Sequence, residues 1–270
     1  MKGNIRRILY FIAYPLLLLE ITRKFFRIMH HFSVHYEDEK ICRKISPELK
    51  VQYGPFKDMK YAKALAAGSA LLPKLTGTYE DELHPFIETM ISQQPELVID
   101  IGCAEGYYAN GIAMRLPDTE VWAIDTDTYA LELCKQNAIA NHQQASIKTN
   151  TTIDFSLLPA HLSIAVICDC EGYEKELFDE QSIPHLTRAN LLIELHDCND
   201  DEISKILLPR FEKTHQLTLI KSNPKKKCSD YPHLQKYQSW LHDRLLDERN
   251  GIIMYWAFLE SKILNGSVKS

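Results

Sequence analysis

The stretch that decides the fold is Leu97-Val98-Ile99-Asp100-Ile101-Gly102-Cys103-Ala104-Glu105-Gly106. Its first five residues are mostly apolar and β-branched, which predicts a buried parallel strand over 97–101. The glycines that follow let the backbone turn tightly beside a ligand before a helix begins near Tyr107. About twenty residues later a second apolar run ends in Asp125, where an acidic side chain can accept both hydroxyls of a nucleotide ribose. Together these segments predict half of a nucleoside-binding βαβ unit.

Strands and helices alternate along the rest of the chain. The expected strands are 97–101, 120–124, 146–149, 165–168, 190–195, 215–220 and 252–259, and the expected helices are 85–92, 106–115, 127–141, 174–179, 201–213 and 234–248. This alternation predicts an α/β fold, with a doubly wound, mostly parallel, seven-stranded Rossmann-like sheet and an N-terminal helical extension. In such a fold the ligands lie outside the carboxyl ends of the strands.

The composition is that of a globular protein. The chain has 270 residues, of which 45% are hydrophobic and 25% charged, enough for one sizeable core. We expect an apolar or amphipathic helix and linker at 1–50 and a single domain at 51–270. The formal net charge of -5 gives no reason to expect nucleic acid as a partner. The seven cysteines include no C-x-x-C pair, so we expect reduced, buried thiols and a cytoplasmic location. The sequence does not determine the oligomeric state.

An apolar run at 8–19 is followed by the basic residues Arg23, Lys24 and Arg27. As a helix this run would reach about 18 Å, short of the roughly 30 Å hydrocarbon core of a bilayer, and Pro15 weakens the helix. No small-residue cleavage site follows it, so we do not expect a cleaved signal peptide. Two alternatives remain. Residues 1–30 make a peripheral contact with the inner face of a membrane, or they dock on the core of the protein itself.

Two other segments also have alternative roles. Glycine and proline residues punctuate 51–82, which predicts a lid or extra strands, and Tyr79, Glu80 and His84 are candidates to cover a cofactor. The basic run 225–227 either grips an anionic acceptor or phospholipid, or is a solvated loop.

The glycine loop lacks the G-x-G-x-x-G spacing of a dinucleotide site, because it reads G-x-x-x-G with Ala104 in the middle. A negative Glu105 would repel phosphate, but it suits a cofactor with a positive sulfonium and an ammonium group. The chain resembles the class I S-adenosylmethionine-dependent methyltransferases, whose first motif is likewise a strand, an acidic residue and a Gly-rich turn. The resemblance implies S-adenosyl-L-methionine as the cofactor, with the glycines under its amino-acid part and Asp125 at its ribose. The residues that we expect to bind it are Asp100, Gly102, Ala104, Glu105, Gly106, Tyr107, Asp125, Thr126 and Asp169.

A second motif lies downstream and reads Asp169-Cys170-Glu171-Gly172-Tyr173-Glu174. It resembles the D-x-E-G-x-E signature of the FkbM-type methyltransferases, and a strand that ends in Ile193-Glu194-Leu195-His196 follows it, as in that family. The resemblance implies transfer of a methyl group to oxygen, on a hydroxyl of a sugar, a lipid-linked glycan or a secondary metabolite. It does not identify the acceptor.

We expect Asp169, Glu171 and His196 to be the catalytic residues, because they follow neighbouring strands at the edge of the sheet where the methyl group should point. A hydroxyl acceptor must lose its proton, and either Asp169 or His196 could be the general base if its surroundings move its pKa toward neutrality. The same carboxylates could instead hold a divalent cation, Mg²⁺ or Ca²⁺, or simply cap the next helix. We assign no metal ligand from the sequence.

Two functions of other classes stay open. One is a non-catalytic protein of methyltransferase fold that acts as a membrane-associated partner of another enzyme. The other is a nicotinamide-dependent oxidoreductase, which the missing G-x-G-x-x-G spacing disfavours.

Overall fold

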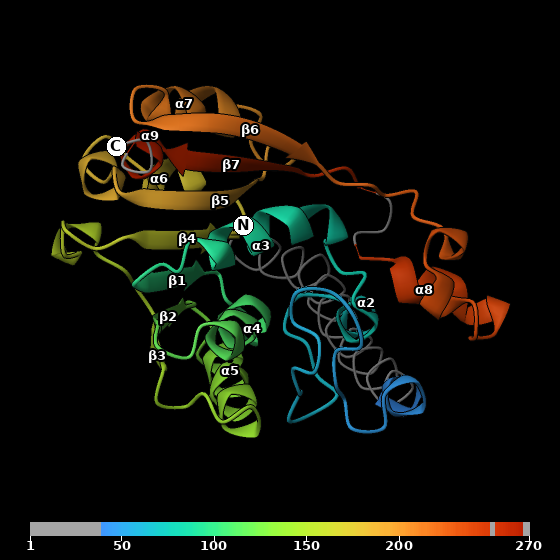
Figure 1. Ribbon diagram of the computed structural model, residues 1–270. Helices are drawn as coiled ribbons and strands as arrows, with labels where there is room; N and C mark the ends of the chain where they lie inside the picture. Colours follow the sequence, from blue (N-terminus) through green and yellow to red (C-terminus); the bar gives the residue numbers. More distant parts are fainter. Residues whose placement is uncertain (1–38, 249–251, 267–270) are drawn as a thin grey trace, which may run out of the picture.

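A computed structural model describes residues 39–248 and 252–266, and within them seven strands form one sheet (Figure 1). The strands are β1 Leu97–Ile101, β2 Glu120–Ile124, β3 Ile147–Asn150, β4 Ile164–Cys168, β5 Ala189–Leu195, β6 His215–Lys221 and β7 Tyr255–Ser261. Their order across the sheet is β3-β2-β1-β4-β5-β7-β6. Strands β1 to β5 are parallel, and β7 runs antiparallel to both β5 and β6. The predicted mostly parallel, Rossmann-like sheet is therefore confirmed.

Helices flank this sheet on both faces (Figure 1). They are α2 Leu71–Thr76, α3 His84–Ser92, α4 Tyr107–Arg115, α5 Thr128–Ala140, α6 Glu174–Leu177, α7 Ile203–Phe211, α8 His242–Leu246 and α9 Lys262–Gly266. The strand order reverses between β1 and β4. In doubly wound sheets such a reversal places the ligand crevice at the carboxyl ends of the strands.

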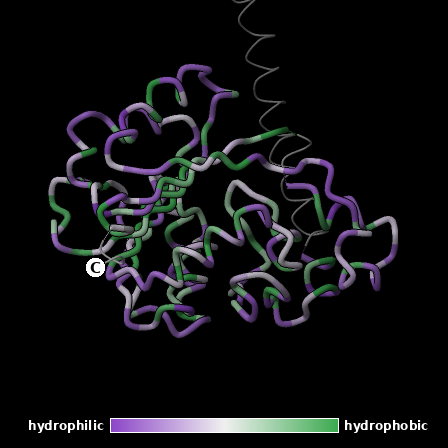
Figure 2. Tube along the Cα trace, turned by 45° about the horizontal axis from the view of Figure 1, so that its top comes forward, coloured by the Kyte–Doolittle hydropathy of each residue, from purple (hydrophilic) through white to green (hydrophobic). Residues whose placement is uncertain are grey.

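The hydrophobic core lies on both sides of the sheet, and β1 shows how the sequence produces it. Val98 packs into the cluster that contains α3, α4 and α5, whereas its neighbour Ile99 packs into the cluster that contains Phe178 and Phe211. Successive side chains of a strand point to opposite faces, so a strand buried on both faces is apolar throughout. Figure 2 shows the hydrophobic colour gathered along the central strands, with more hydrophilic loops around them.

The region between β6 and β7 differs from the prediction. Instead of a helix over 234–248, it forms short 3-10 turns and the five-residue helix α8. Gln238 has an extended backbone, with φ -63° and ψ 141°, which interrupts the helix before Ser239. The predicted last strand also starts later, at Tyr255 rather than at 252.

The segment before the sheet is part of the same core. Residues 39–45 are helical, and Cys42, Ile45 and Leu49 are buried in the cluster that covers one face of the sheet. The predicted apolar run at 8–19 lies outside the described residues, as does the predicted membrane contact of residues 1–30. Within the described ranges, no helix has the length and apolar character needed to span a bilayer.

All seven cysteines lie in the described ranges, and all are free thiols. Five are buried, Cys170 is half-buried and Cys198 is exposed. The prediction that the thiols are buried therefore holds for those five, and their reduced state stays a prediction.

Candidate functional site

A cavity of about 1120 Å³ opens at the carboxyl ends of β1, β2, β4 and β5. Its walls come from the loops after these strands, from the loop after β3, and from the segment 67–79 ahead of α3. The predicted site residues that line it are Asp100, Gly102, Ala104, Tyr107, Asp125, Thr126, Asp169, Glu171 and His196. Glu105 and Gly106 do not line it. The cavity thus brings together the expected cofactor loop and the expected catalytic residues.

The loop after β1 fits its surroundings only with glycine at its first position. Gly102 has φ +72°, and a Cβ atom there would lie 1.6 Å from the carbonyl oxygen of Asp169. Ala104 has φ +48°, and its backbone N–H donates a hydrogen bond of 2.8 Å to Asp125 Oδ2. The loops that follow β1, β2 and β4 are therefore packed into one wall of the cavity.

Two carboxylates fix this wall. Asp125 Oδ1 accepts a hydrogen bond from the backbone N–H of Asp127, and Asp100 Oδ2 accepts one from that of Ala109 at the start of α4. Asp100 is 2% exposed, and its burial raises the pKa of its carboxyl to about 7, with a smaller contribution from the charges of Asp125 and Asp169. The hydrogen bond from Ala109 acts in the opposite direction.

The contact of Glu105 and Gly106 with the cofactor stays a prediction, and the structure gives both residues another role in the wall. Glu105 is fully buried, and its carboxylate accepts from Lys74 Nζ at 2.6 Å and from the Ala67 backbone N–H at 2.9 Å. It therefore holds the segment ahead of α3 against the loop, with its charge paired inside the wall. At Gly106 a Cβ would lie 2.5 Å from Cys134 Sγ, so this glycine permits close packing of α4 on α5.

His196 is the centre of the second half of the site. Its Nδ1 lies 2.7 Å from Glu174 Oε1, and both side chains are buried. Its Nε2 lies 3.5 Å from Asp169 Oδ1, 3.6 Å from Glu171 Oε2 and 3.8 Å from Glu194 Oε2. One ring nitrogen is thus held by a buried carboxylate, and the other faces three acids at the wall of the cavity.

Burial alone would lower the pKa of His196, but the hydrogen bond to Glu174 and the charges of Glu174, Asp169 and Glu171 raise it above its usual value. With Glu174 accepting from Nδ1–H, the neutral ring carries its lone pair on Nε2. This arrangement can accept a proton from a hydroxyl. One ligand atom each of Asp169, Glu171 and His196 also lies within 4.8 Å of the others, which suits the ligand set of a divalent cation.

The sequence did not assign a site role to several lining or supporting residues. Glu174 closes the second motif, yet its role as the partner of His196 appears only once α6 places it beside the end of β5. The sequence marks Glu194 as the acid that ends a strand but indicates no role for it in the site. Lys74 and Glu248 line the cavity from segments with no recognisable motif, and sequence spacing offers no signal that would find them.

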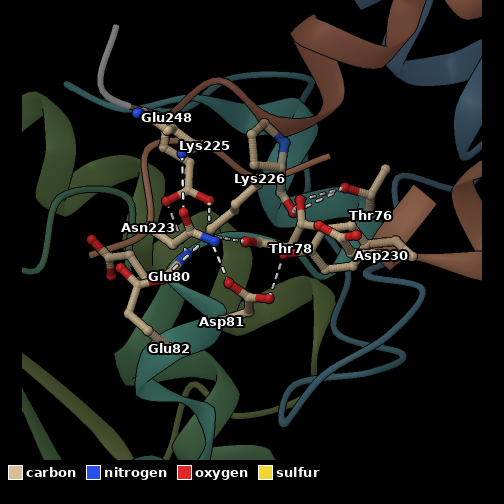
Figure 3. Close-up of polar contacts among 12 residues, drawn as sticks. Thr76, Thr78, Glu80, Asp81, Glu82, Asn223, Lys225, Lys226, Asp230 and Glu248 are labelled. Atoms are coloured by element: carbon tan, nitrogen blue, oxygen red, sulfur yellow. Dashed lines mark hydrogen bonds and ion pairs between the residues drawn. The ribbon is translucent and has the colours of Figure 1, made fainter. Parts of the chain in front are cut away.

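The buried Lys226 joins the segment 78–82, just ahead of α3, to the region between β6 and β7 (Figure 3). Lys226 Nζ lies 2.6 Å from Glu248 Oε1, 2.7 Å from Asp81 Oδ1 and 3.3 Å from Glu82 Oε2. It also donates a hydrogen bond to the Thr78 carbonyl oxygen. The Lys226 side chain is only 4% exposed, so it is not a solvated lysine and its charge is not available to an anionic acceptor.

The flanking residues Lys225 and Lys227 are exposed, as expected for a loop. Burial raises the pKa of Glu248 to about 7, and the neighbouring Lys226 opposes this shift. Glu248 also lines the main cavity. The ion pairs of Lys226 with residues from distant parts of the chain therefore reach the site through Glu248.

Comparison with known protein families gives one match. Residues 84–156 match the family model described as Methyltransferase small domain. The matched part contains the loop after β1 and Asp125, whereas Asp169, Glu171 and His196 lie beyond it. The cofactor half of the cavity is therefore the part that is similar to a methyltransferase family.

Several solved structures are similar to the chain at low sequence identity. Precorrin-6y C5,15-methyltransferase from Geobacter metallireducens has 11% identity and a TM-score of 0.42, over 65% of this chain and 87% of that chain. The StiE O-MT structure has 17% identity and a TM-score of 0.42, over 67% and 73%. TrmN from Thermus thermophilus has 15% identity and a TM-score of 0.43, over 70% and 48%. No curated protein sequence matches the chain.

Proposed function

We propose that this protein is an S-adenosyl-L-methionine-dependent methyltransferase that methylates a hydroxyl oxygen, with His196 as the general base. One observation carries the proposal. The glycine loop with Asp125 opens into the same cavity as His196, whose Nδ1 is held by the buried Glu174. The FkbM-like motif points to an acceptor hydroxyl on a sugar, a lipid-linked glycan or a secondary metabolite.

The residues of the cofactor half fit this cofactor. Gly102 and Ala104 border the cavity with little or no side chain, so a ligand can approach their backbone. Asp125 stands at the same wall as an acceptor for ribose hydroxyls. A cavity of about 1120 Å³ has room for a nucleoside with its amino-acid part and for an acceptor.

When bound, S-adenosyl-L-methionine supplies an electrophilic methyl group on a sulfonium. The remaining work falls to residues of the chain. Neutral His196 accepts the hydroxyl proton at Nε2, while Glu174 holds Nδ1–H and stabilises the imidazolium that forms. Asp169, Glu171 and Glu194 surround Nε2 and favour its positive charge. The cavity walls would position the acceptor hydroxyl for methyl transfer, and such positioning supplies much of the rate of a displacement.

The close approach of Asp169, Glu171 and His196 also favours a second arrangement, in which these groups bind a divalent cation that lowers the pKa of the acceptor hydroxyl. The two arrangements predict different responses to chelation. Loss of methyl transfer in EDTA and recovery with Mg²⁺ or Ca²⁺ would support the cation. Full activity in EDTA would support His196 as the base acting without one.

Calorimetric titration tests the proposal without knowledge of the acceptor. S-adenosyl-L-methionine and S-adenosylhomocysteine should bind, whereas NAD should not. Preferential binding of NAD would contradict the proposal and favour a nicotinamide-dependent oxidoreductase. If the cofactor binds but no methylated product forms across a broad panel of hydroxyl compounds, the non-catalytic partner becomes the better interpretation.

A further inference from the structure

Lys74 combines two properties that rarely occur together. Its side chain is only 3% exposed, yet it lines the cavity beside the glycine loop. Helix α2 places it there, in the cavity that Gly102 and Ala104 also line. A lysine is seldom buried without a partner, so its contacts indicate the role of its positive charge.

The ammonium group of Lys74 has partners on the protein side. Nζ lies 2.6 Å from Glu105 Oε1 and 2.7 Å from Ser69 Oγ. The rings of Tyr79 and Tyr107 lie 4.7 and 5.4 Å from it, within the range of cation–π contacts. Two of its three N–H donors are therefore used by these oxygens among the described residues. The third can serve a ligand.

The ion pair between Lys74 and Glu105 is oriented relative to the cavity. Glu105 lies behind the wall and does not border the cavity, whereas Lys74 does. The pair therefore presents its positive end to the ligand and its negative end to the protein. Glu105 fixes the lysine and prevents it from reaching solvent.

Lys74 is also the one lysine or arginine among the described residues that lines the cavity. The acidic residues that line the cavity are Asp100, Asp125, Asp127, Asp154, Asp169, Glu171, Glu176, Glu194 and Glu248. A cofactor with a sulfonium, an ammonium and a carboxylate has many partners there for its positive groups. For its carboxylate, Lys74 is the single cationic side chain on offer, apart from the titratable His196.

We infer that Lys74 binds the carboxylate of the cofactor's amino-acid part, and that Glu105 is the positioning residue that holds it. This inference rests on the proposed function, because it assumes S-adenosyl-L-methionine as the cofactor. It also explains why an acidic residue stands in the glycine loop without touching the ligand.

Two ligands that differ in the relevant group test this assignment. S-adenosylhomocysteine carries the amino-acid carboxylate, and 5′-methylthioadenosine lacks the whole amino-acid part. Calorimetry on Lys74→Met should show S-adenosylhomocysteine binding weakened about tenfold to hundredfold, the loss expected for a charge-assisted hydrogen bond. Binding of 5′-methylthioadenosine should change less than about twofold. Lys63→Met, at an exposed lysine 11 positions before Lys74, is the matched control and should bind both ligands as the native protein does.

Because Lys74→Met leaves the buried Glu105 unpaired, it could fail to fold. The double variant Lys74→Met/Glu105→Gln removes both charges and should show the same selective loss. Glu105→Gln alone keeps the ammonium and should retain most of the affinity for S-adenosylhomocysteine. Equal losses for both ligands, or an equal loss in Glu105→Gln and Lys74→Met, would overturn the inference. If the native protein binds neither ligand, the proposed function itself fails.

Discussion

His196 shows how a single side chain takes its properties from its neighbours. Four carboxylates surround the ring, and the one that bonds Nδ1 is also the most deeply buried. Burial would by itself favour the neutral imidazole, but the bond to Glu174 and the nearby charges outweigh it and raise the pKa of His196. The ring should therefore be a stronger base than a histidine in water, provided that Glu174 stays ionised.

The pKa of His196 can be measured directly by NMR titration of its ring signals. In the native protein it should lie above the usual value of about 6.5. In Glu174→Gln it should fall, because the main anionic partner is gone. Once an acceptor is known, the acid limb of the pH profile for kcat/KM should move to lower pH in the same variant, since only the neutral ring accepts a proton. An unchanged ring titration in Glu174→Gln would contradict this account.

At the level of single residues, the sequence predicted which acidic and basic side chains gather at the site better than it predicted their hydrogen-bond and ion-pair partners. Asp169, Glu171 and His196 could be placed together because the carboxyl ends of parallel strands share one edge of the sheet. Glu105 was assigned to the cofactor because its charge suited an ammonium group. In the structure that charge is paired with Lys74. The segment that carries Lys74 has no regular hydrophobic pattern from which its position beside the glycine loop could be predicted.

At the scale of elements, the strand, loop and helix from β1 to α4 depend on one close backbone contact. Gly102→Ala would place a Cβ 1.6 Å from the Asp169 carbonyl oxygen, on the backbone of a neighbouring loop that cannot move aside cheaply. We expect a loss of more than about 4 kcal/mol in the free energy of unfolding, or no folded protein at all.

Gly68→Ala is the matched control for Gly102→Ala. Gly68 also has a positive φ of +68°, but nothing lies within 4 Å of a Cβ there. Its substitution should cost only the conformational strain, about 1–2 kcal/mol. Similar losses in the two variants, measured by urea unfolding, would show that the contact with Asp169 is not what requires glycine at 102.

The junction between the segment 78–82 and the region between β6 and β7 is held by Lys226. Removing its ammonium would leave Asp81, Glu82 and Glu248 close together without a counter-charge. Lys226→Met should therefore lower the free energy of unfolding by about 3–5 kcal/mol. The loss should shrink as the pH falls from 8 to 5, because the carboxyls can then take up protons.

Lys225 provides the comparison in the same loop. It is exposed, so Lys225→Met should change stability by less than about 0.5 kcal/mol. If Lys226→Met were equally mild, the cluster in Figure 3 would not be a structural junction. Three of its partners, Thr78, Asp81 and Glu82, lie more than 140 positions from Lys226 in sequence, which is why the run 225–227 could only be described as basic.

At the scale of the whole molecule, the parallel half of the fold was predictable and the antiparallel edge was less so. Strands β1, β4 and β5 are buried on both faces, and apolar runs of that kind are recognisable without structural information. The region between β6 and β7 lacks such a pattern. Its polar residues mix with aromatic ones at irregular spacing, and contacts with the distant segment 78–82 hold Lys226 and helix α8 in place.

Asp100 is buried in β1, among the central strands of the sheet. Its burial makes the stability of the protein depend on pH. Its folded-state pKa of about 7 compares with about 3.9 in an unfolded chain. Between these values the folded protein keeps a proton that the unfolded chain has lost, so stability falls as pH rises, by up to about 1.4 kcal/mol per pH unit from this group. Asp100→Asn cannot ionise, and its amide oxygen can still accept from the Ala109 N–H.

Urea unfolding of the native protein and Asp100→Asn at pH 5, 6, 7 and 8, without ligand, measures this contribution. Other buried groups contribute to both curves, so the informative quantity is the difference between them. The variant should gain stability relative to the native protein as pH rises from 5 to 7, and the difference should level off above about pH 7, where the native carboxyl is ionised in both states. Parallel curves would mean that Asp100 is already ionised in the folded protein at pH 5. Its carboxylate would then face the cavity as a charged group over the whole physiological range, and the cofactor's positive groups would meet one more fixed anion.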